Sequence, residues 1–181
     1  MIFHPLDLEG AVLVDAEPRE DGRGLFARTF CCEEFAALGL CNRFVQCNTS
    51  YNARRGTLRG LHFQAAPHEE IKLVRCTQGT ILDVIVDLRP ASPSFRRWAA
   101  VELSAGNRRA LYVPAGFAHG FQTLTDAAEV FYQMSEGYVP GLARGVRWDD
   151  PAFAISWPVE PPILSERDAA FADFTGAGPS P

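Results

Sequence analysis

The feature that most constrains the fold is a series of short, strand-like segments separated by closely spaced turn residues. Residues 44–50 alternate, with Val45 and Cys47 on one face and Gln46, Asn48 and Ser50 on the other. Further segments rich in β-formers are 80–88, 98–103, 109–113, 120–124 and 129–134. In 80–88 one predicted face carries Leu82, Val84, Val86 and Leu88, and the opposite face carries Ile81, Asp83, Ile85 and Asp87. Helix is expected only at roughly 33–38 and 165–171. Many short strands with such punctuation predict an all-β fold, either an antiparallel sandwich or a barrel.

Composition narrows the function classes. A chain of 181 residues with 47% hydrophobic content is long enough for one domain with a real core. The net charge of −5, with both signs interspersed, argues against a nucleic-acid partner. No apolar run approaches the roughly 20 residues that span a bilayer, and the N-terminus lacks the features of a secretory signal. The five cysteines are odd in number and include no CxxC pair, so we expect free thiols in the cytoplasm.

Lys72 is the only lysine, whereas the other sixteen basic side chains are arginine. It follows His62 by ten residues. An imidazole base beside a compact ammonium suits proton removal next to a carbonyl, because one group takes the proton and the other stabilises the oxyanion. The alternative is that the single lysine lies at this position by chance. The number of lysines alone does not decide between a catalytic Lys72 and chance.

Two histidines lie in glycine-framed, strand-like segments. The spacing Pro114-x-Gly116-x-x-His119 resembles the second motif of the cupin barrels, a jelly-roll superfamily. The first cupin motif would read His62-Phe63-Gln64, with glutamine where metal-binding cupins have a second histidine. Two imidazoles are a thin ligand set, because transition metals usually take at least three protein ligands. We therefore predict no metal and no other cofactor, with a metal-dependent cupin oxygenase or isomerase as the alternative.

Ten short motifs occur in order along the chain. They are Asp-Gly-Arg-Gly-x-Phe (21–26), Phe-Val-Gln-Cys-Asn (44–48), Gly-Thr-Leu-Arg-Gly-Leu-His-Phe-Gln (56–64), Lys-Leu-Val-Arg-Cys (72–76), Asp-Val-Ile-Val-Asp-Leu-Arg (83–89), Gly-Phe-Ala-His-Gly-Phe (116–121), Glu-Val-Phe-Tyr-Gln (129–133), Trp-Asp-Asp-Pro (148–151), Ile-Ser-Trp-Pro (155–158) and Leu-Ser-Glu-Arg-Asp (164–168). From about residue 3 to residue 174 the chain resembles the dTDP-4-dehydrorhamnose 3,5-epimerase family. The resemblance implies a double-stranded β-helix (cupin, jelly-roll) barrel with short peripheral helices, one domain over 1–174 and a flexible tail over 175–181.

The same resemblance implies roles for five residues. His62 would remove protons beside the C4 ketone of the sugar, and Asp168 would orient the imidazole. Lys72 would stabilise the enolate oxygen, His119 would line the same pocket, and Tyr132 would return a proton from the opposite face. Asp168 has a competing interpretation, because Ser165-x-x-Asp168 also fits a helix capping box.

Further positions match the family's nucleotide-binding residues. Arg23, Gln46, Asn48, Arg59 and Arg167 would hold the nucleotide and its diphosphate, Tyr138 would stack on the base, and Phe26 would lie near the nucleotide. Three residues depart from the family pattern. Arg28, at a substrate-binding position, and Ala143 replace acidic residues, and Cys47 replaces an aspartate. The departures at Arg28 and Ala143 leave the nucleotide open.

The sequence thus predicts a cofactor-independent epimerase that inverts C3 and/or C5 of a nucleotide-linked 4-keto-6-deoxyhexose through an enolate, in rhamnose-type deoxysugar biosynthesis. The expected partners are the nucleotide-sugar substrate and a second copy of the chain in a homodimer, with no nucleic acid and no membrane. Besides the metal-dependent cupin, the alternatives are a non-catalytic sugar-binding cupin, a 3- or 5-mono-epimerase, a ketoisomerase, and an enzyme for a CDP-linked sugar.

Overall fold

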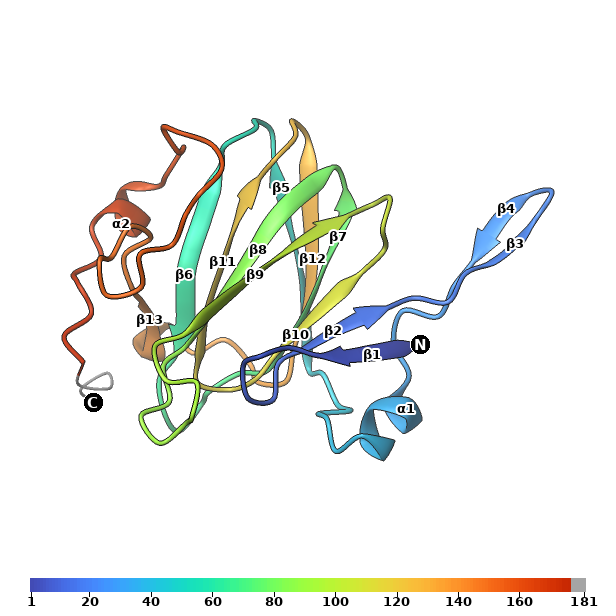
Figure 1. Ribbon diagram of the computed structural model, residues 1–181, viewed down its shortest axis with the longest axis horizontal. Helices are drawn as coiled ribbons and strands as arrows, with labels where there is room; N and C mark the ends of the chain where they lie inside the picture. The colour runs from blue at the N-terminus through green and yellow to red at the C-terminus, as the bar shows by residue number, and fades with distance from the viewer. Residues whose placement is uncertain (177–181) are drawn as a thin grey trace.

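Two antiparallel sheets face each other in the computed structural model, which describes residues 1–176 (Figure 1). The six-stranded sheet has the order β1 (Ile2–Pro5), β2 (Val12–Asp15), β10 (Ala110–Val113), β7 (Lys72–Gln78), β12 (Ala128–Met134) and β5 (Gln46–Asn52). The five-stranded sheet has the order β13 (Ala143–Gly145), β6 (Leu58–Gln64), β11 (Phe117–Thr123), β8 (Thr80–Asp87) and β9 (Trp98–Ser104). This is the jelly-roll arrangement that the family resemblance implies.

Helices are short and peripheral, as expected. They are α1 (Cys32–Ala37), α2 (Glu166–Ala169) and a 3₁₀ turn (Pro140–Leu142). Phe35 of α1 is fully buried and covers the outer face of the six-stranded sheet near β2 and β10. The segment that leads to α2 packs on the outer face of the five-stranded sheet, where Phe153 and Trp157 meet Val84 and Val86 of β8.

The main core lies between the two sheets. Val74, Leu111 and Val130 project from one sheet towards Ile81, Ile85, Phe117 and Phe121 of the other. The alternation predicted for 80–88 is therefore confirmed, because Ile81 and Ile85 point inward whereas Val84 and Val86 point to the outer layer. Asp83 is buried between these two inward-facing isoleucines, and its carboxylate pairs with His119.

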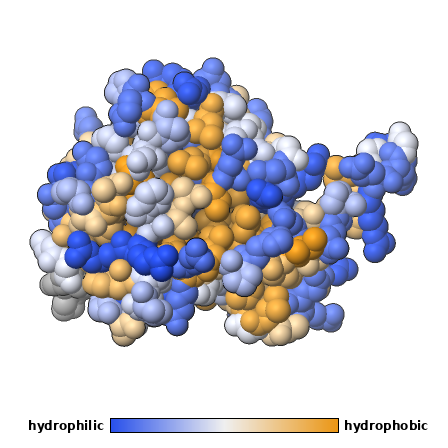
Figure 2. Space-filling view, in the orientation of Figure 1, coloured by the Kyte–Doolittle hydropathy of each residue, from blue (hydrophilic) through white to orange (hydrophobic). Residues whose placement is uncertain are grey.

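A hairpin stands apart from this barrel. Strands β3 (Arg19–Asp21) and β4 (Gly24–Phe26) pair only with each other, and Figure 1 shows them projecting well away from the sheets. In the space-filling view the hairpin is an isolated arm with a largely hydrophilic surface (Figure 2). Phe26 near its base is 74% exposed. The predicted tail, 175–181, lies outside the described residues from 177 onwards.

Candidate active site

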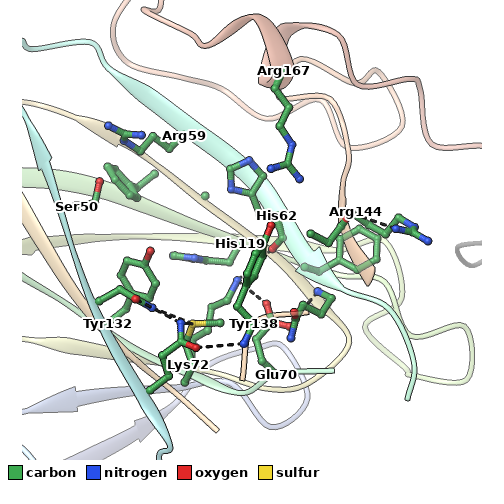
Figure 3. Close-up of a pocket in the computed structure, with 18 residues that line it drawn as sticks. Ser50, Arg59, His62, Glu70, Lys72, His119, Tyr132, Tyr138, Arg144 and Arg167 are labelled. Carbon is green, nitrogen blue, oxygen red and sulfur yellow. Dashed lines mark hydrogen bonds and ion pairs between the residues drawn. The ribbon is translucent and has the colours of Figure 1, made fainter. Parts of the chain in front are cut away.

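A cavity of about 400 Å³ opens between the two sheets (Figure 3). The inner faces of β5, β7 and β12 form one wall, and β6 and β11 form the other. The residues predicted for chemistry that line it are His62, Lys72, His119 and Tyr132, and those predicted for the nucleotide are Gln46, Asn48, Arg59, Tyr138 and Arg167. The fold thus brings residues that are far apart in the sequence to one cavity.

Close approach of two strands aligns the histidines. His62 of β6 is directly opposite His119 of β11 in the antiparallel register. Two residues before His62 on β6, a Cβ on Gly60 would lie 2.5 Å from the Gly120 Cα of β11, and a Cβ on Gly120 would lie 2.7 Å from the Arg59 carbonyl oxygen. Only glycine fits at such a contact. The two glycines therefore let the strands meet and hold both imidazoles at the cavity.

His62 and Asp168 form a dyad between β6 and α2. The His62 Nε2 lies 2.7 Å from Asp168 Oδ1, and Asp168 Oδ2 accepts a hydrogen bond from the Gly60 N–H at 3.2 Å. Burial raises the pKa of the Asp168 carboxyl, but the hydrogen bond and charge of His62, the Gly60 N–H and the charge of Arg167 outweigh it, so this pKa lies below its ordinary value. An ionised carboxylate favours the proton on Nε2, which leaves Nδ1 with the lone pair that a base needs.

The capping interpretation of Asp168 is also correct in part. The Ser165 hydroxyl accepts a hydrogen bond from the Asp168 N–H at 3.1 Å, as an N-cap does. The Asp168 carboxylate accepts hydrogen bonds from His62 and the Gly60 N–H, and not from the N–H of Ser165 as a full capping box requires. The two roles are divided between the main chain and the side chain of one residue.

His119 belongs to a second dyad that sequence reasoning missed. Its Nε2 lies 2.8 Å from Oδ1 of Asp83, a fully buried residue of β8. The other carboxylate oxygen, Oδ2, has no hydrogen-bond partner among residues 1–176. The available signal was an aspartate between Ile81 and Ile85 on the inward face of 80–88.

Lys72 is held from two sides. Its Nζ lies 3.0 Å from Glu70 Oε1 and donates to the His62 carbonyl oxygen at 3.3 Å. Both side chains of this ion pair are less than 10% exposed. Glu70 lies in the connection between β6 and β7, where strand periodicity gives no signal, and was not predicted.

Tyr132 projects from β12 into the cavity. Burial raises the pKa of its hydroxyl, and the nearby charge of Arg59 lowers it by less, so the pKa lies above its ordinary value. The hydroxyl therefore stays protonated at neutral pH and can act as an acid.

The mouth of the cavity carries the residues predicted to bind nucleotide. Gln46 Oε1 accepts a hydrogen bond from the Tyr138 N–H at 3.1 Å, and Tyr138 is 52% exposed. Gln64 Oε1 accepts from the Val139 N–H at 2.6 Å, and its amide nitrogen donates to the carbonyl oxygens of His68 and Gly137. Gln64, at the position of the second cupin histidine, thus anchors the loop that carries Tyr138.

Three predicted binding residues do not reach this cavity within one chain. Arg23 is 91% exposed and pairs with Asp21 of the same hairpin at 2.6 Å. Phe26 is exposed, and Arg28 pairs with Glu34 at 2.6 Å. Their assignment to the binding site remains a prediction.

Other cavity residues were not singled out from the sequence. Those with polar or sulfur-bearing side chains are Ser50, Glu70, Met134 and Arg144. Ser50 could have been found, because it shares the alternating face of Gln46 and Asn48. Within residues 1–176, no three His, Cys, Asp or Glu side chains are grouped so that they could hold a metal ion. The same residues include no helix long and apolar enough to cross a membrane.

Comparisons with known proteins point to one enzyme family. The family model described as dTDP-4-dehydrorhamnose 3,5-epimerase matches residues 5–175. A dTDP-4-dehydrorhamnose 3,5-epimerase from Shigella flexneri is 44% identical over 158 residues, which is 87% of each chain. A dTDP-4-dehydrorhamnose 3-epimerase from Streptomyces niveus is 40% identical, over 93% of this chain and 81% of its own. The crystal structure of the 3,5-epimerase from Bacillus anthracis with TDP and PPi bound has a TM-score of 0.93 and 43% identity, with 96% of this chain and 99% of that chain covered.

Proposed function

The chain belongs to the dTDP-4-dehydrorhamnose 3,5-epimerase family, and on that premise we propose that its single domain, 1–174, inverts C3 and C5 of a dTDP-linked 4-keto-6-deoxyhexose without a cofactor. It is an isomerase of deoxysugar biosynthesis. The observation that carries the mechanism is the convergence of the His62–Asp168 dyad, Lys72 and Tyr132 on one cavity.

His62 is the base in the first step. C3 and C5 flank the C4 ketone, so a proton on either carbon can be removed if the electron pair moves onto the ketone oxygen. His62 Nδ1 takes the proton, and the negative Asp168 carboxylate stabilises the imidazolium that forms. Lys72 donates a hydrogen bond to the enolate oxygen.

Inversion requires a proton from the other face. Tyr132 gives its hydroxyl proton to the carbon, the enolate collapses to the ketone, and the phenolate remains. His62 loses its proton and Tyr132 regains one through solvent, which resets the site. The hydroxyl is protonated before the step, because burial holds its pKa above the ordinary value.

Arginines at the cavity suit a nucleoside diphosphate. Arg59 and Arg167 line it, and guanidinium groups bind phosphate oxygens in bidentate fashion. Arg167 precedes Asp168 on α2, so one helical turn carries a phosphate ligand and the partner of the base. Tyr138, exposed at the mouth, offers its ring to the nucleobase.

We further propose a homodimer that works in the cytoplasm. The projecting β3–β4 hairpin carries Arg23 and Phe26, and Arg28 follows it, so all three could reach the cavity of a second copy but not their own. All five cysteines of the described residues are free, which suits a reducing compartment. Light scattering at micromolar concentration tests the assembly, and a monomer would contradict it.

A 3-mono-epimerase is the second candidate, favoured by the similarity to the Streptomyces niveus enzyme, which is named as a 3-epimerase. Incubation with dTDP-, CDP- and UDP-linked 4-keto-6-deoxyglucose, followed by NMR at C3 and C5, separates the possibilities. We expect inversion at both carbons of the dTDP sugar. Inversion at C3 alone would support the second candidate, and turnover of the CDP sugar alone would overturn the nucleotide assignment.

A further inference from the structure

Glu70 is a buried carboxylate in the cavity that the proposed reaction does not use. It is 7% exposed, lines the cavity beside Lys72, and its Oε1 lies 3.0 Å from the Lys72 Nζ (Figure 3). We propose that Glu70 is a positioning residue for the Lys72 ammonium. The proposal rests on the proposed function, since it concerns the group that stabilises the enolate oxygen.

The ammonium has three N–H bonds to distribute. One is directed to Glu70 Oε1 and a second to the His62 carbonyl oxygen at 3.3 Å. With two donors committed to the protein, the third has a fixed direction. Lys72 lines the cavity, so this third donor is the one available to a ketone oxygen placed there.

Glu70 is itself anchored, which is what a positioning group needs. Its second oxygen, Oε2, accepts a hydrogen bond from the Gln64 N–H at 2.9 Å, at the end of β6. The carboxylate therefore joins the main chain of β6, the strand of the base, to the side chain of Lys72 at the start of β7. Glu70 thus fixes the flexible four-carbon side chain of Lys72 relative to β6, the strand that carries His62.

Burial makes this arrangement depend on both partners. Lys72 and Glu70 are each 7% exposed, so the removal of one charge leaves the other buried without a counter-charge. A bare ammonium is free to turn towards other acceptors in the cavity, such as the oxygens of Gln46 and Asn48. The catalytic donor would then be present but misdirected.

Glu70→Gln separates positioning from a merely structural role. The glutamine oxygen can still accept from the Gln64 N–H, but the variant loses the carboxylate that faces Lys72. We expect kcat to fall at least tenfold while KM and the Kd for dTDP stay within twofold. Glu129→Gln is the matched control, because this carboxylate is partly buried but does not line the cavity. It accepts a hydrogen bond from Thr77 Oγ1 at 2.7 Å. The control should keep the kcat of the parent.

A double-mutant cycle tests whether Glu70 acts through Lys72. In a Lys72→Met background, Glu70→Gln should change kcat by less than twofold, because the group to be positioned is gone. An equal, independent loss in both backgrounds would overturn the proposal and assign Glu70 a structural role. If Glu70→Gln does not fold, Glu70→Asp, which keeps the charge but draws it back, replaces it in the same cycle.

A readout that does not depend on turnover comes from the lysine count. Lys72 is the only lysine, so reductive methylation followed by peptide mapping reports on its Nζ alone, apart from the N-terminal amine. We expect Glu70→Gln to raise the methylation rate at least fivefold over the parent, and Glu129→Gln to leave it unchanged. An unchanged rate in Glu70→Gln would overturn the proposal. If the methylation rates follow this expectation but the parent epimerises no 4-keto-6-deoxy sugar, the proposed function is refuted and the positioning of Lys72 is not.

Discussion

The loss of one hydroxyl, in Tyr132→Phe, separates the two halves of the proposed reaction. His62 should still remove the proton beside the ketone and can return it to the same face. Exchange of that hydrogen with solvent deuterium should therefore stay within a few-fold of the parent. Inversion needs the proton from Tyr132, and the loss of a general acid typically costs ~10²–10⁴-fold. The expected result is exchange without epimerisation.

The structure also sets the expected stability of this variant. Within residues 1–176 the Tyr132 hydroxyl is affected by burial and by the charge of Arg59 but by no hydrogen bond, and the variant keeps the ring. No partner is left unsatisfied, so the free energy of unfolding should change by less than about 1 kcal/mol. Tyr112→Phe is the contrasting control, because the Tyr112 hydroxyl accepts from the Cys41 N–H at 3.0 Å away from the cavity. That variant should lose about 1–3 kcal/mol of stability and no activity.

The assay is NMR of the dTDP-linked 4-keto sugar in heavy water, with exchange and inversion measured at C3 and C5 in one sample. If exchange and inversion fall together in Tyr132→Phe, the tyrosine is not the opposing acid. A parent-like rate of inversion would equally refute the two-sided mechanism.

Three further predictions follow from the same site. Lys72→Arg should lower kcat by ~10²–10³-fold in steady-state kinetics, because a planar guanidinium cannot take the place of a compact ammonium held by Glu70. Activity within a few-fold of the parent would show that only the charge of Lys72 matters. The folded pKa of Asp168 lies below its ordinary value, so its carboxylate contributes stability that is present above about pH 4 and is lost as the pH falls through the folded pKa. Asp168→Asn should therefore show a flatter decline of stability in thermal unfolding from pH 7 to pH 3, and an unchanged slope would refute the linkage. Activity should be complete in EDTA, whereas inactivation that added metal reverses would revive the metal-dependent cupin.

The all-β class was predictable because strand alternation reports directly on burial, whereas the jelly-roll barrel came from the family resemblance. In 80–88 the two faces were separated correctly, and both faces proved to be buried, one in the core and one under the C-terminal segment. Strand limits were less accurate: β5 begins at Gln46 and runs to Asn52, since its start is fixed by pairing with Met134 of β12. Pairing partners are distant in sequence, so local patterns cannot set such limits.

The site was predictable where a motif carried it and not where packing made it. His62, Lys72, His119 and Tyr132 were expected to share a cavity, and they do. Glu70 was missed because it lies in a connection without periodicity, and its role depends on a contact between two strands. The partner of His119, Asp83, lies 36 residues away, and only the register of β8 with β11 brings the two together.

The projecting hairpin illustrates a third limit. Arg23 and Phe26 belong to a motif of the family, yet one chain does not bring them to its cavity. A motif records which residues act together and not which copy of the chain supplies each of them. Assembly is therefore a separate question from the fold of the single chain.

The account depends most on His62 as the base, and the direct measurement is deuterium incorporation at C3 and C5 of the dTDP-linked 4-keto-6-deoxyglucose by the parent and by His62→Ala. The parent should incorporate deuterium at both carbons. His62→Ala should bind dTDP as the parent does and lose incorporation by several orders of magnitude. Incorporation at the parent's rate in His62→Ala, or none in the parent, would contradict the account.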